Sequence, residues 1–279
     1  MLSDTGAAYT AFDSALRKSL AGIAQFTTHD VAADTSWTSD AADLIIAVGM
    51  KATEAALGRT DVPVLAVMVP KAGYEALLGR GSSQQRLKPT SAIYINQPWL
   101  RQIDFIRVVL PRRSKIGVLY SPVVVQRELD DMRAAATARG MKLHTHQVSS
   151  PESLFATLDT LLNDDEVLLA IPDSAIYNPG NMRNILLSSY RARIPLVGIS
   201  QAYVTAGALG AVYSSPEQLA HQSAGMVRSF AKSGDLPGVR YPEDFSVAVN
   251  LQVARSLGIG LASQEEIRTR MIEYGEGMR

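Results

Sequence analysis

The stretch that decides the fold is Asp43-Leu44-Ile45-Ile46-Ala47-Val48-Gly49-Met50-Lys51-Ala52. It joins an apolar run of strand length to a short loop and then to helix-forming residues. Further apolar runs are followed by a loop in the same way, namely residues 64–68, 116–120, 167–171 and 195–199. Near-continuous apolar runs of this length are typical of parallel strands buried on both faces. The sequence therefore predicts an α/β fold in which parallel sheets are flanked by helices.

The pattern stops at Pro111-Arg112-Arg113 and restarts at Lys115, which predicts two Rossmann-like lobes. A helix opened by Pro98 and ended by Pro111 is expected to carry the chain from the first lobe to the second. In open α/β sheets, ligands bind at the carboxyl ends of the strands. We therefore expect a ligand cleft where the carboxyl edges of two such sheets face each other.

Periodicity and capping residues predict the remaining elements. Helices are expected at residues 8–20, 52–57, 72–78, 98–110, 123–139, 151–162, 180–193 and 216–232, with two more beginning at 251 and 264. Strands are expected at residues 91–95, 142–147, 208–213 and 245–249, with a weak one at 23–27. Residues 37–40 and 79–89 are expected to be loops. Ser215 and Gln218 match a capping box, and Gly140 suits a helix end.

Composition argues against several functional classes. The chain has 27 Lys and Arg residues against 27 Asp and Glu residues and no clustered basic stripe, so nucleic-acid binding is disfavoured. No run approaches the ~18 apolar residues of a membrane span. Cysteine is absent, which rules out disulfides, thiol nucleophiles and cysteine-ligated zinc.

The start of the chain is unusual. Met1-Leu2 leads at once into Ser3-Asp4-Thr5-Gly6, so the sequence shows no signal peptide. Ser3-Asp4 has the character of a loop after a first strand, although two residues precede it. We expect that the sequence lacks a leader and part of that strand.

Residues suited to catalysis or metal binding are few. The sequence contains no dinucleotide-binding glycine motif, phosphate loop or nucleophile elbow. His144 and His146 share one face of a predicted strand, which is compatible with a metal pair. A solvated strand face is favoured, because no third ligand lies near in sequence. The acidic pairs are interpreted as solvated charges: Asp130-Asp131, Asp164-Asp165 and Glu265-Glu266. We expect no catalytic residue, no metal and no cofactor.

Polar and aromatic residues gather instead at the predicted carboxyl ends of strands. In the first lobe these are Ser3, Asp4, Thr5, Tyr9, Gly49, Met50, Lys51, Asn96 and Gln97. In the second lobe they are Tyr120, Ser121, Asp173, Tyr177, Ser200 and Tyr203. The free N–H groups and positive dipole end of a helix that starts after Gly49 favour an anionic group such as a carboxylate. Tyrosine combines a flat apolar ring with a hydroxyl, which suits a small amphipathic ligand.

Simpler roles compete with ligand binding at several of these positions. Ser3, Ser121 and Ser200 are equally suited to cap helices, and Asp173 is equally suited to a turn after Pro172. The tyrosines are also compatible with packing along lobe edges. The ensemble at the strand ends, more than any one residue, predicts a binding site.

Several segments resemble the substrate-binding proteins of ABC transporters with the type I periplasmic-binding-protein fold. Residues 43–52 and 62–65 are similar to the first lobe of that family, and residues 115–122 to the opening strand of the second lobe. The closing part is the most specific, and it comprises residues 207–213, 249–251 and 254–259. The resemblance covers nearly the whole chain.

The resemblance implies two lobes joined by three crossing segments, with a ligand clamped by hinge closure. It implies that residues 1–98 and about 215–240 form lobe one, and that about 99–214 and 241–279 form lobe two. It also implies a solute-binding protein without catalysis, which passes a small organic molecule to a membrane permease. Aromatic amino acids are one family precedent. If the ligand is an amino acid, we expect Asp173 or Asp4 to pair with its ammonium group. Periplasmic or lipid-anchored extracytoplasmic placement is expected from the family.

Two alternatives stay open at this point. The same fold serves as the sensory ligand-binding module of signalling systems, and neighbouring permease and ATPase genes would distinguish a transport protein from such a module. A two-lobed sugar-nucleotide enzyme is also compatible with paired Rossmann-like lobes, although the missing phosphate loops argue against it.

Overall fold

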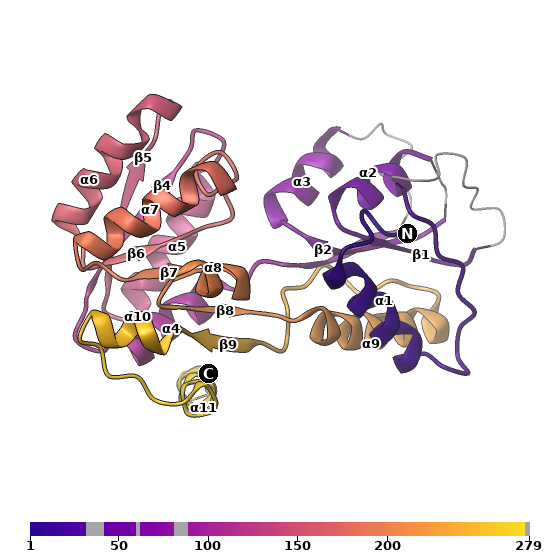
Figure 1. The fold of residues 1–279 in the computed structure, drawn as a ribbon. Coiled ribbons are helices and arrows are strands. Elements are labelled where there is room, and N and C mark those ends of the chain that lie inside the picture. The colour runs from indigo at the N-terminus through magenta and orange to yellow at the C-terminus, as the bar shows by residue number, and fades with distance from the viewer. Residues whose placement is uncertain (32–41, 60–61, 81–88, 277–279) are drawn as a thin grey trace. The chain divides into compact units, whose positions relative to one another are not determined.

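A computed structural model of the chain describes residues 1–31, 42–59, 62–80 and 89–276 (Figure 1). The chain forms two compact units. Unit 1 comprises Met1–Gln97 and Ser214–Phe245, and unit 2 comprises Pro98–Tyr213 and Ser246–Arg279. Each unit contains a sheet flanked by helices, which confirms the predicted α/β class. The expected loop at residues 37–40 and most of the one at 79–89 lie outside the described residues.

The last boundary between the units follows Phe245, whereas the resemblance implied a boundary near residue 240. Residues 240 and 241 belong to unit 1 by their contacts. The Arg240 N–H donates to the Ala92 carbonyl at 2.8 Å, and the Tyr241 ring centroid lies 5.4 Å from that of Tyr94. This segment therefore lies along the first sheet before the chain crosses to unit 2.

Unit 1 contains a parallel sheet in the order β1-β2-β3, formed by Ile45–Val48, Val64–Val69 and Thr90–Tyr94. Leu2 adds single bridges to Val48 and to Asp30 beside β1. The helices of this unit are α1 (Ala7–Ser19), α2 (Met50–Arg59), α3 (Lys71–Arg80) and α9 (Pro216–Ser233). The strand-loop-helix order of the deciding stretch is thus confirmed in β1 and α2, and it repeats in β2 and α3.

The predicted strand at residues 23–27 is wrong, because no strand forms there. Gly22 adopts φ +76° in the turn after α1, and Ile23 is 54% exposed. The Arg17 guanidinium carbon lies 5.0 Å from the centroid of the Phe26 ring, so this segment returns beside α1. The chain then reaches the sheet at Asp30.

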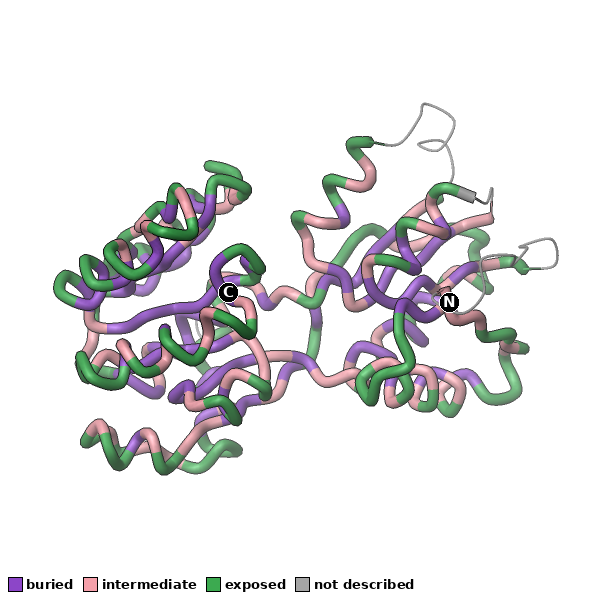
Figure 2. The backbone as a smooth tube through the Cα atoms, turned by 45° about the horizontal axis from the view of Figure 1, so that its top comes forward, coloured by how far each residue is buried: buried purple, intermediate pink, exposed green. Residues whose placement is uncertain are grey.

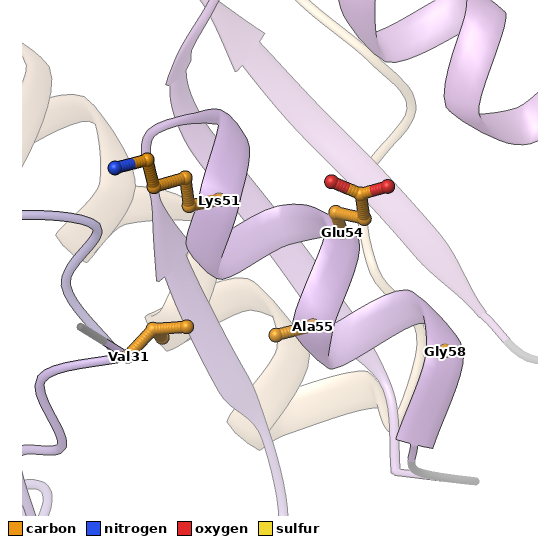
Figure 3. Close-up of a pocket in the computed structure, with 5 residues that line it drawn as sticks. All are labelled: Val31, Lys51, Glu54, Ala55 and Gly58. Carbon is orange, nitrogen blue, oxygen red and sulfur yellow. The ribbon is translucent and has the colours of Figure 1, made fainter. Parts of the chain in front are cut away.

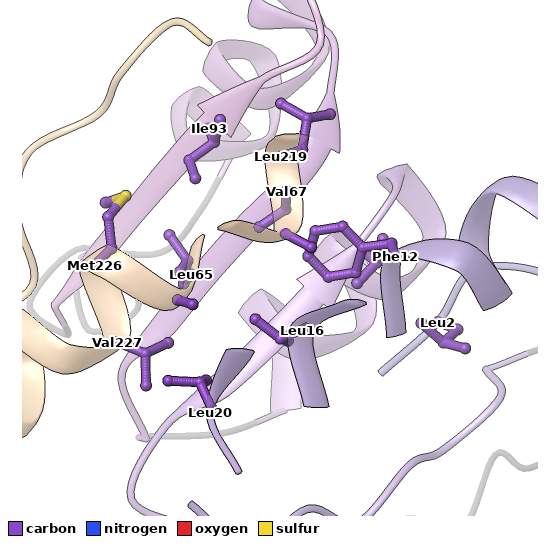
Figure 4. Close-up of a cluster of buried hydrophobic side chains, with 13 residues drawn as sticks. Leu2, Phe12, Leu16, Leu20, Leu65, Val67, Ile93, Leu219, Met226 and Val227 are labelled. Carbon is purple, nitrogen blue, oxygen red and sulfur yellow. The ribbon is translucent and has the colours of Figure 1, made fainter. Parts of the chain in front are cut away.

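The first sheet carries a hydrophobic core that it shares with α1 and α9 (Figure 4). Phe12, Leu16 and Leu20 repeat at helical spacing and are buried. They meet side chains from β2, β3 and α9, namely Leu65, Val67, Ile93, Leu219, Met226 and Val227. Burying a side chain of this size contributes about 1.5–3 kcal/mol. In each unit a central strand is largely buried, Val64–Val69 in unit 1 and Lys115–Tyr120 in unit 2 (Figure 2).

A β-bulge at Met68 changes the direction in which β2 presents its side chains. Val67 pairs with Ile93 and Val69 pairs with Tyr94, so Met68 is an extra residue, and its φ is +58°. Val69 consequently joins the same cluster as Ala66, whereas strict alternation would place it beside Val67. The bulge therefore sets the exit of the chain from β2 into α3.

One hydroxyl group links all three crossing segments on the unit 1 side. The chain crosses after Gln97, before Ser214 and after Phe245. The Gln97 Nε2 donates to Ser214 Oγ at 2.8 Å, and Ser214 Oγ donates to the Asp244 carbonyl at 2.6 Å. The adjacent capping box is confirmed, because Ser215 Oγ accepts from the Gln218 N–H and Gln218 Oε1 accepts from the Ser215 N–H.

Unit 2 contains a six-stranded sheet in the order β5-β4-β6-β7-β8-β9. The strands are β4 (Lys115–Tyr120), β5 (Lys142–Gln147), β6 (Val167–Leu169), β7 (Leu196–Gly198), β8 (Gly210–Tyr213) and β9 (Ser246–Val249). β9 runs antiparallel to β8, and the other pairs are parallel. The predicted parallel arrangement therefore holds up to β8, and the last strand departs from it.

The helices of unit 2 lie close to the predicted positions. They are α4 (Trp99–Val109), α5 (Gln126–Ala138), α6 (Leu154–Asp164, after a short 3-10 helix at Pro151–Ser153), α7 (Pro179–Arg191), α8 (Gln201–Ala206), α10 (Leu251–Ser256) and α11 (Gln264–Glu276). α8 was not predicted, because six residues give too few positions for helical periodicity. α4 packs against α5 and α11, whereas α6 packs on β4 and β5.

The interpretation of Asp165 as a solvated charge is wrong, whereas the face of β5 that carries His144 and His146 is partly solvated, with side-chain exposures of 44% and 14%. The Asp165 carboxylate is buried, with His144 Nδ1 at 2.6 Å from Oδ1 and His146 Nε2 at 2.9 Å from Oδ2. The two histidines do share a face of β5, but α6 ends at Asp165 beside them. Gly117 of β4 leaves the space for this carboxylate, since a Cβ there would lie 2.6 Å from Asp165 Oδ2.

We expect Ser214→Ala to lower the free energy of unfolding by about 1–3 kcal/mol, because it removes a buried acceptor and a buried donor at once. Urea unfolding followed by circular dichroism measures the change. Ser229→Ala is the matched control, since Ser229 is exposed on α9 of the same unit. Equal stability of the two variants would show that the Ser214 hydroxyl does not hold the crossing segments.

We expect Gly117→Ala to destabilise the protein by about 1–3 kcal/mol, because the added methyl group would also lie 2.5 Å from Leu161 Cγ. Gly225→Ala in α9 has open space around it and should instead stabilise by about 0.5–1 kcal/mol. Thermal unfolding of the two variants compares them directly. A Gly117→Ala protein as stable as the wild type would contradict the close packing around Asp165.

Candidate functional site

In unit 1, the segments after Leu2, β1, β2 and β3 leave the same edge of the sheet, because the strands run parallel. We call this the carboxyl edge of unit 1. Ser3 is buried there, and its Oγ accepts a hydrogen bond from the Ala52 N–H at 2.8 Å. Ser3 therefore caps α2 from a neighbouring segment. Among the described residues, none accepts a hydrogen bond from the amides of Met50 and Lys51 in the same turn.

Gly49 connects β1 to α2 with φ +85°, a conformation that favours glycine. A Cβ at this position would lie 2.8 Å from both Ser3 Oγ and the Tyr9 hydroxyl. Burial raises the pKa of Tyr9, and the charge of Asp4 adds to this effect. Ser3, Tyr9 and Gly49 thus lie together at the start of α2. Met50 packs on Gly73, where a Cβ would lie 2.9 Å from its Cε.

Asn96 caps the next helix in the same manner. Its Oδ1 accepts from the Lys71 N–H at 2.8 Å, which joins the loop after β3 to the start of α3. Lys71 was not among the predicted residues, although it follows β2 much as Lys51 follows β1. Since the candidate residues were selected because they follow a strand, the same criterion would also have selected Lys71. Gln97, the next predicted residue, instead donates to Ser214.

Besides Met50, Asn96 and Gln97, three more predicted residues of unit 1 lie outside the cluster around Ser3. Asp4 is exposed and its Oδ1 accepts from the Gly6 N–H at 2.9 Å, and Thr5 is exposed beside it. Lys51 lines a shallow pocket of about 490 Å³ on α2, together with Val31, Glu54, Ala55 and Gly58 (Figure 3). The Lys51 amine and the Glu54 carboxylate, which line this pocket, lie on the exposed surface of α2. We therefore assign no ligand to the pocket.

Asp173 holds together the carboxyl edge of unit 2. Its side chain is buried, Oδ2 accepts from the Ser121 N–H at 2.7 Å, and Oδ1 accepts from the Ala175 N–H at 3.1 Å. The carboxylate thereby ties the loop after β4 to the loop after β6. The turn role considered for Asp173 is present, yet each carboxylate oxygen can still accept another hydrogen bond.

Two predicted tyrosines lie at this edge, where Tyr177 adjoins Asp173 and Tyr203 lies near Tyr177. The Tyr177 N–H donates to the Asp173 carbonyl at 2.8 Å. Burial raises the pKa of the Tyr177 hydroxyl, and the proximity of Tyr203 and Asp173 raises it further. Tyr203 packs on Gly198, where a Cβ would lie 2.9 Å from its Cγ. The close contact explains the glycine at the end of β7.

Two hydroxyl groups at this edge are buried without a hydrogen-bond partner, Ser121 Oγ and the Tyr177 hydroxyl. The Leu119 backbone lowers the pKa of the Tyr177 hydroxyl by its proximity, but the contact does not meet hydrogen-bond geometry. Tyr120 is partly exposed at the end of β4, and Ser200 precedes α8 without capping it through its side chain. The structure thus places Ser121 and Tyr177 beside Asp173, with Tyr203 near Tyr177.

Within residues 1–31, 42–59, 62–80 and 89–276, no group of three or more His, Cys, Asp or Glu side chains is placed to hold a metal ion. In the same part of the chain, no helix is long and apolar enough to cross a membrane.

The chain is a two-unit α/β protein with polar groups at the carboxyl edges of its sheets, an arrangement suited to ligand binding. The sequence model of the ABC transporter substrate binding protein family matches residues 24–272. The chain therefore belongs to this family, whose members are solute-binding proteins and not enzymes. A search of curated proteins finds no match.

Solved structures share the fold. An ABC domain from Streptococcus pneumonia in complex with L-Trp is 16% identical over 96% of each chain, with a TM-score of 0.64. The open, ligand-free substrate binding protein CD0873 from Clostridium difficile is 19% identical over 95% of each chain, with a TM-score of 0.73. A periplasmic ribose ABC transporter protein from Conexibacter woesei is 11% identical over 96% of this chain and 95% of its own, with a TM-score of 0.51. These likenesses confirm the type I periplasmic-binding-protein fold.

We expect Ser3→Ala to lower the free energy of unfolding by about 1–3 kcal/mol, because the buried Ala52 amide loses its acceptor. Thr5→Ala, two residues further along and exposed, should change stability by less than about 0.5 kcal/mol. Urea unfolding of both variants tests the difference. A Ser3→Ala protein with wild-type stability would show that α2 does not depend on this cap.

Proposed function

We propose that this chain binds a small organic solute, such as an amino acid or an aromatic compound, and delivers it to the membrane permease of an ABC transporter. Membership of the substrate-binding family supports the general role. The proposal places the protein outside the cytoplasmic membrane, where a solute is captured before uptake. The clamping of one solute by both units, which the resemblance implies, stays a prediction.

The observation that carries the proposal is that, at the two carboxyl edges, some polar groups have hydrogen-bond partners and others have none. The side chains of Ser3, Asn96 and Asp173 fix the loops there by accepting hydrogen bonds from backbone N–H groups. Other polar groups beside them have no partner among the described residues, namely the amides of Met50 and Lys51 and the hydroxyls of Ser121 and Tyr177. Rigid loops that present unpaired donors and acceptors are typical of ligand sites.

The neighbouring structure with bound L-Trp supports an amino acid as one class to test. The tyrosines predicted to contribute, Tyr9, Tyr177 and Tyr203, offer ring faces suited to an organic molecule with an apolar part. A sugar is the competing class, since a structural neighbour is a ribose transporter protein.

A thermal-shift screen of the purified protein tests the proposal with amino acids, sugars, nucleosides and small aromatic acids. A solute present at about 100 times its dissociation constant should add roughly 2.7 kcal/mol to the free energy of unfolding. We expect a saturable shift from one chemical class, and solutes of matched charge and ionic strength serve as controls. A folded protein that shows no saturable shift with any class would contradict solute binding.

A further inference from the structure

The edge of the unit 2 sheet at which its parallel strands begin carries a set of exposed basic side chains. β5, β4, β6 and β7 are neighbours and run in one direction, so the connections that precede them meet at this edge (Figure 1). It lies opposite the carboxyl edge of the same sheet. We call its exposed cations the basic edge, which comprises Arg112, Lys115, Lys142, Arg191 and Arg193. Because they come from separate parts of the chain, the sequence alone shows no basic stripe.

Acidic side chains offset this charge only in part. At the same edge, Asp164 is exposed, Asp165 is buried and Glu166 is partly exposed. Glu166 Oε2 accepts hydrogen bonds from the Ser114 N–H at 2.6 Å and the Lys115 N–H at 3.0 Å, so this carboxylate holds the backbone. Within the part of the chain that the structure describes, no residue of the basic edge forms an ion pair. The edge therefore presents an excess of positive charge to the solvent.

Local stability does not account for the two lysines of the basic edge. Lys115 and Lys142 are Cα partners in the β4–β5 ladder, and both are exposed. Partners on neighbouring strands project from the same face of a sheet, and like charges placed side by side are destabilising. A lysine on the edge strand β5 discourages pairing with another chain, which explains Lys142. It does not explain a second lysine beside it.

Arg193 is a second unfavourable choice at this edge, because it follows α7 with φ +57°. Its N–H donates to the Tyr190 carbonyl at 3.0 Å, and the Ile194 N–H donates to the Ser189 carbonyl at 3.0 Å. Glycine is the usual residue in such a turn, since the left-handed conformation strains a residue with a Cβ. The helix dipole favours a cation near a helix C-terminus and explains Arg191, but it does not require one at the strained position. Two locally unfavourable choices that place cations at one edge indicate a binding surface.

We propose that the basic edge binds the surface of an anionic phospholipid membrane. The phosphate groups of such lipids complement exposed Lys and Arg side chains, and the attraction extends over about 10 Å. Contact through this edge leaves the carboxyl edge of unit 2 facing the solution from which a solute is captured. The attraction is reversible and is screened by salt, so it retains the protein beside the membrane without anchoring it. The inference rests on the proposed function only for the placement of the protein beside that membrane.

Cosedimentation of the full chain with lipid vesicles, in the absence of any solute, tests the inference. One set of vesicles contains about 30% phosphatidylglycerol in phosphatidylcholine, and the other contains phosphatidylcholine alone. At about 50 mM NaCl, we expect binding to the anionic vesicles to be at least about 10-fold tighter than binding to the neutral ones. Raising NaCl to about 300 mM should weaken binding to the anionic vesicles about 10-fold.

A double variant connects vesicle binding to the basic edge. Lys115→Gln/Lys142→Gln should weaken binding to the anionic vesicles about 25-fold, since each lysine near the surface contributes about 5-fold. Lys18→Gln/Lys232→Gln is the matched control, because it removes the same charge from exposed lysines at the ends of α1 and α9 in unit 1. The control should bind as the wild type does.

Arg193→Gly separates membrane binding from a structural role. Glycine relieves the left-handed strain, so the unfolding temperature should rise. The same variant should nevertheless bind the anionic vesicles about 5-fold more weakly. A variant that is more stable and binds less cannot owe its weaker binding to misfolding.

The outcomes separate the inference from the proposed function. Equal binding to anionic and neutral vesicles, or equal loss of binding in the two double variants, would overturn the inference while solute binding stands. Binding to soluble heparin that depends on Lys115 and Lys142, without binding to anionic vesicles, would also overturn it. Vesicle binding that depends on the basic edge, together with a flat screen of all solute classes, would support the inference and contradict the proposed function.

Discussion

The parallel direction of the strands is the constraint on which the rest of this structure depends. Parallel neighbours cannot be joined by a tight turn, so each connection needs a helix that returns the chain to the starting edge. The carboxyl ends of the strands then lie at one edge of each sheet, together with the amino ends of the following helices. Polar loops distant in sequence meet there, and Ser3 with Ala52 and Asp173 with Ser121 are direct results.

The same constraint explains how much of the fold could be predicted. Apolar runs such as residues 44–48 are long enough to mark buried strands, and proline or capping serines mark the helices between them. The failures occurred where tertiary contacts override local pattern. Residues 23–27 resemble a strand by composition, but the Arg17 contact with Phe26 and the turn at Gly22 keep them out of the sheet. α8 is too short to show periodicity, and no local signal distinguishes β9 as antiparallel.

The sequence predicted which loops form the candidate site, but it did not predict what each side chain in those loops does. Position after a strand selected Ser3, Asn96, Ser121 and Asp173, and it would also have selected Lys71. It does not distinguish a residue that caps a helix from one that holds a ligand, because that depends on which partners the fold brings near. Aspartates show this clearly: Asp165 follows a helix in an acidic pair and is nevertheless buried against two imidazoles that lie some twenty residues earlier.

The extra residue in β2 has a consequence for how proteins of this fold diversify. Met68 shifts the strand by one position without breaking the pairs on either side of it, so the sheet tolerates the insertion. Everything downstream, including Pro70 and the first turn of α3, is rotated to the other side of the strand by that single residue. One inserted residue in a strand can therefore change the direction of the loop that follows, even when the sequence of that loop is unchanged. Two relatives with identical loops and a one-residue difference in β2 would present those loops in different directions.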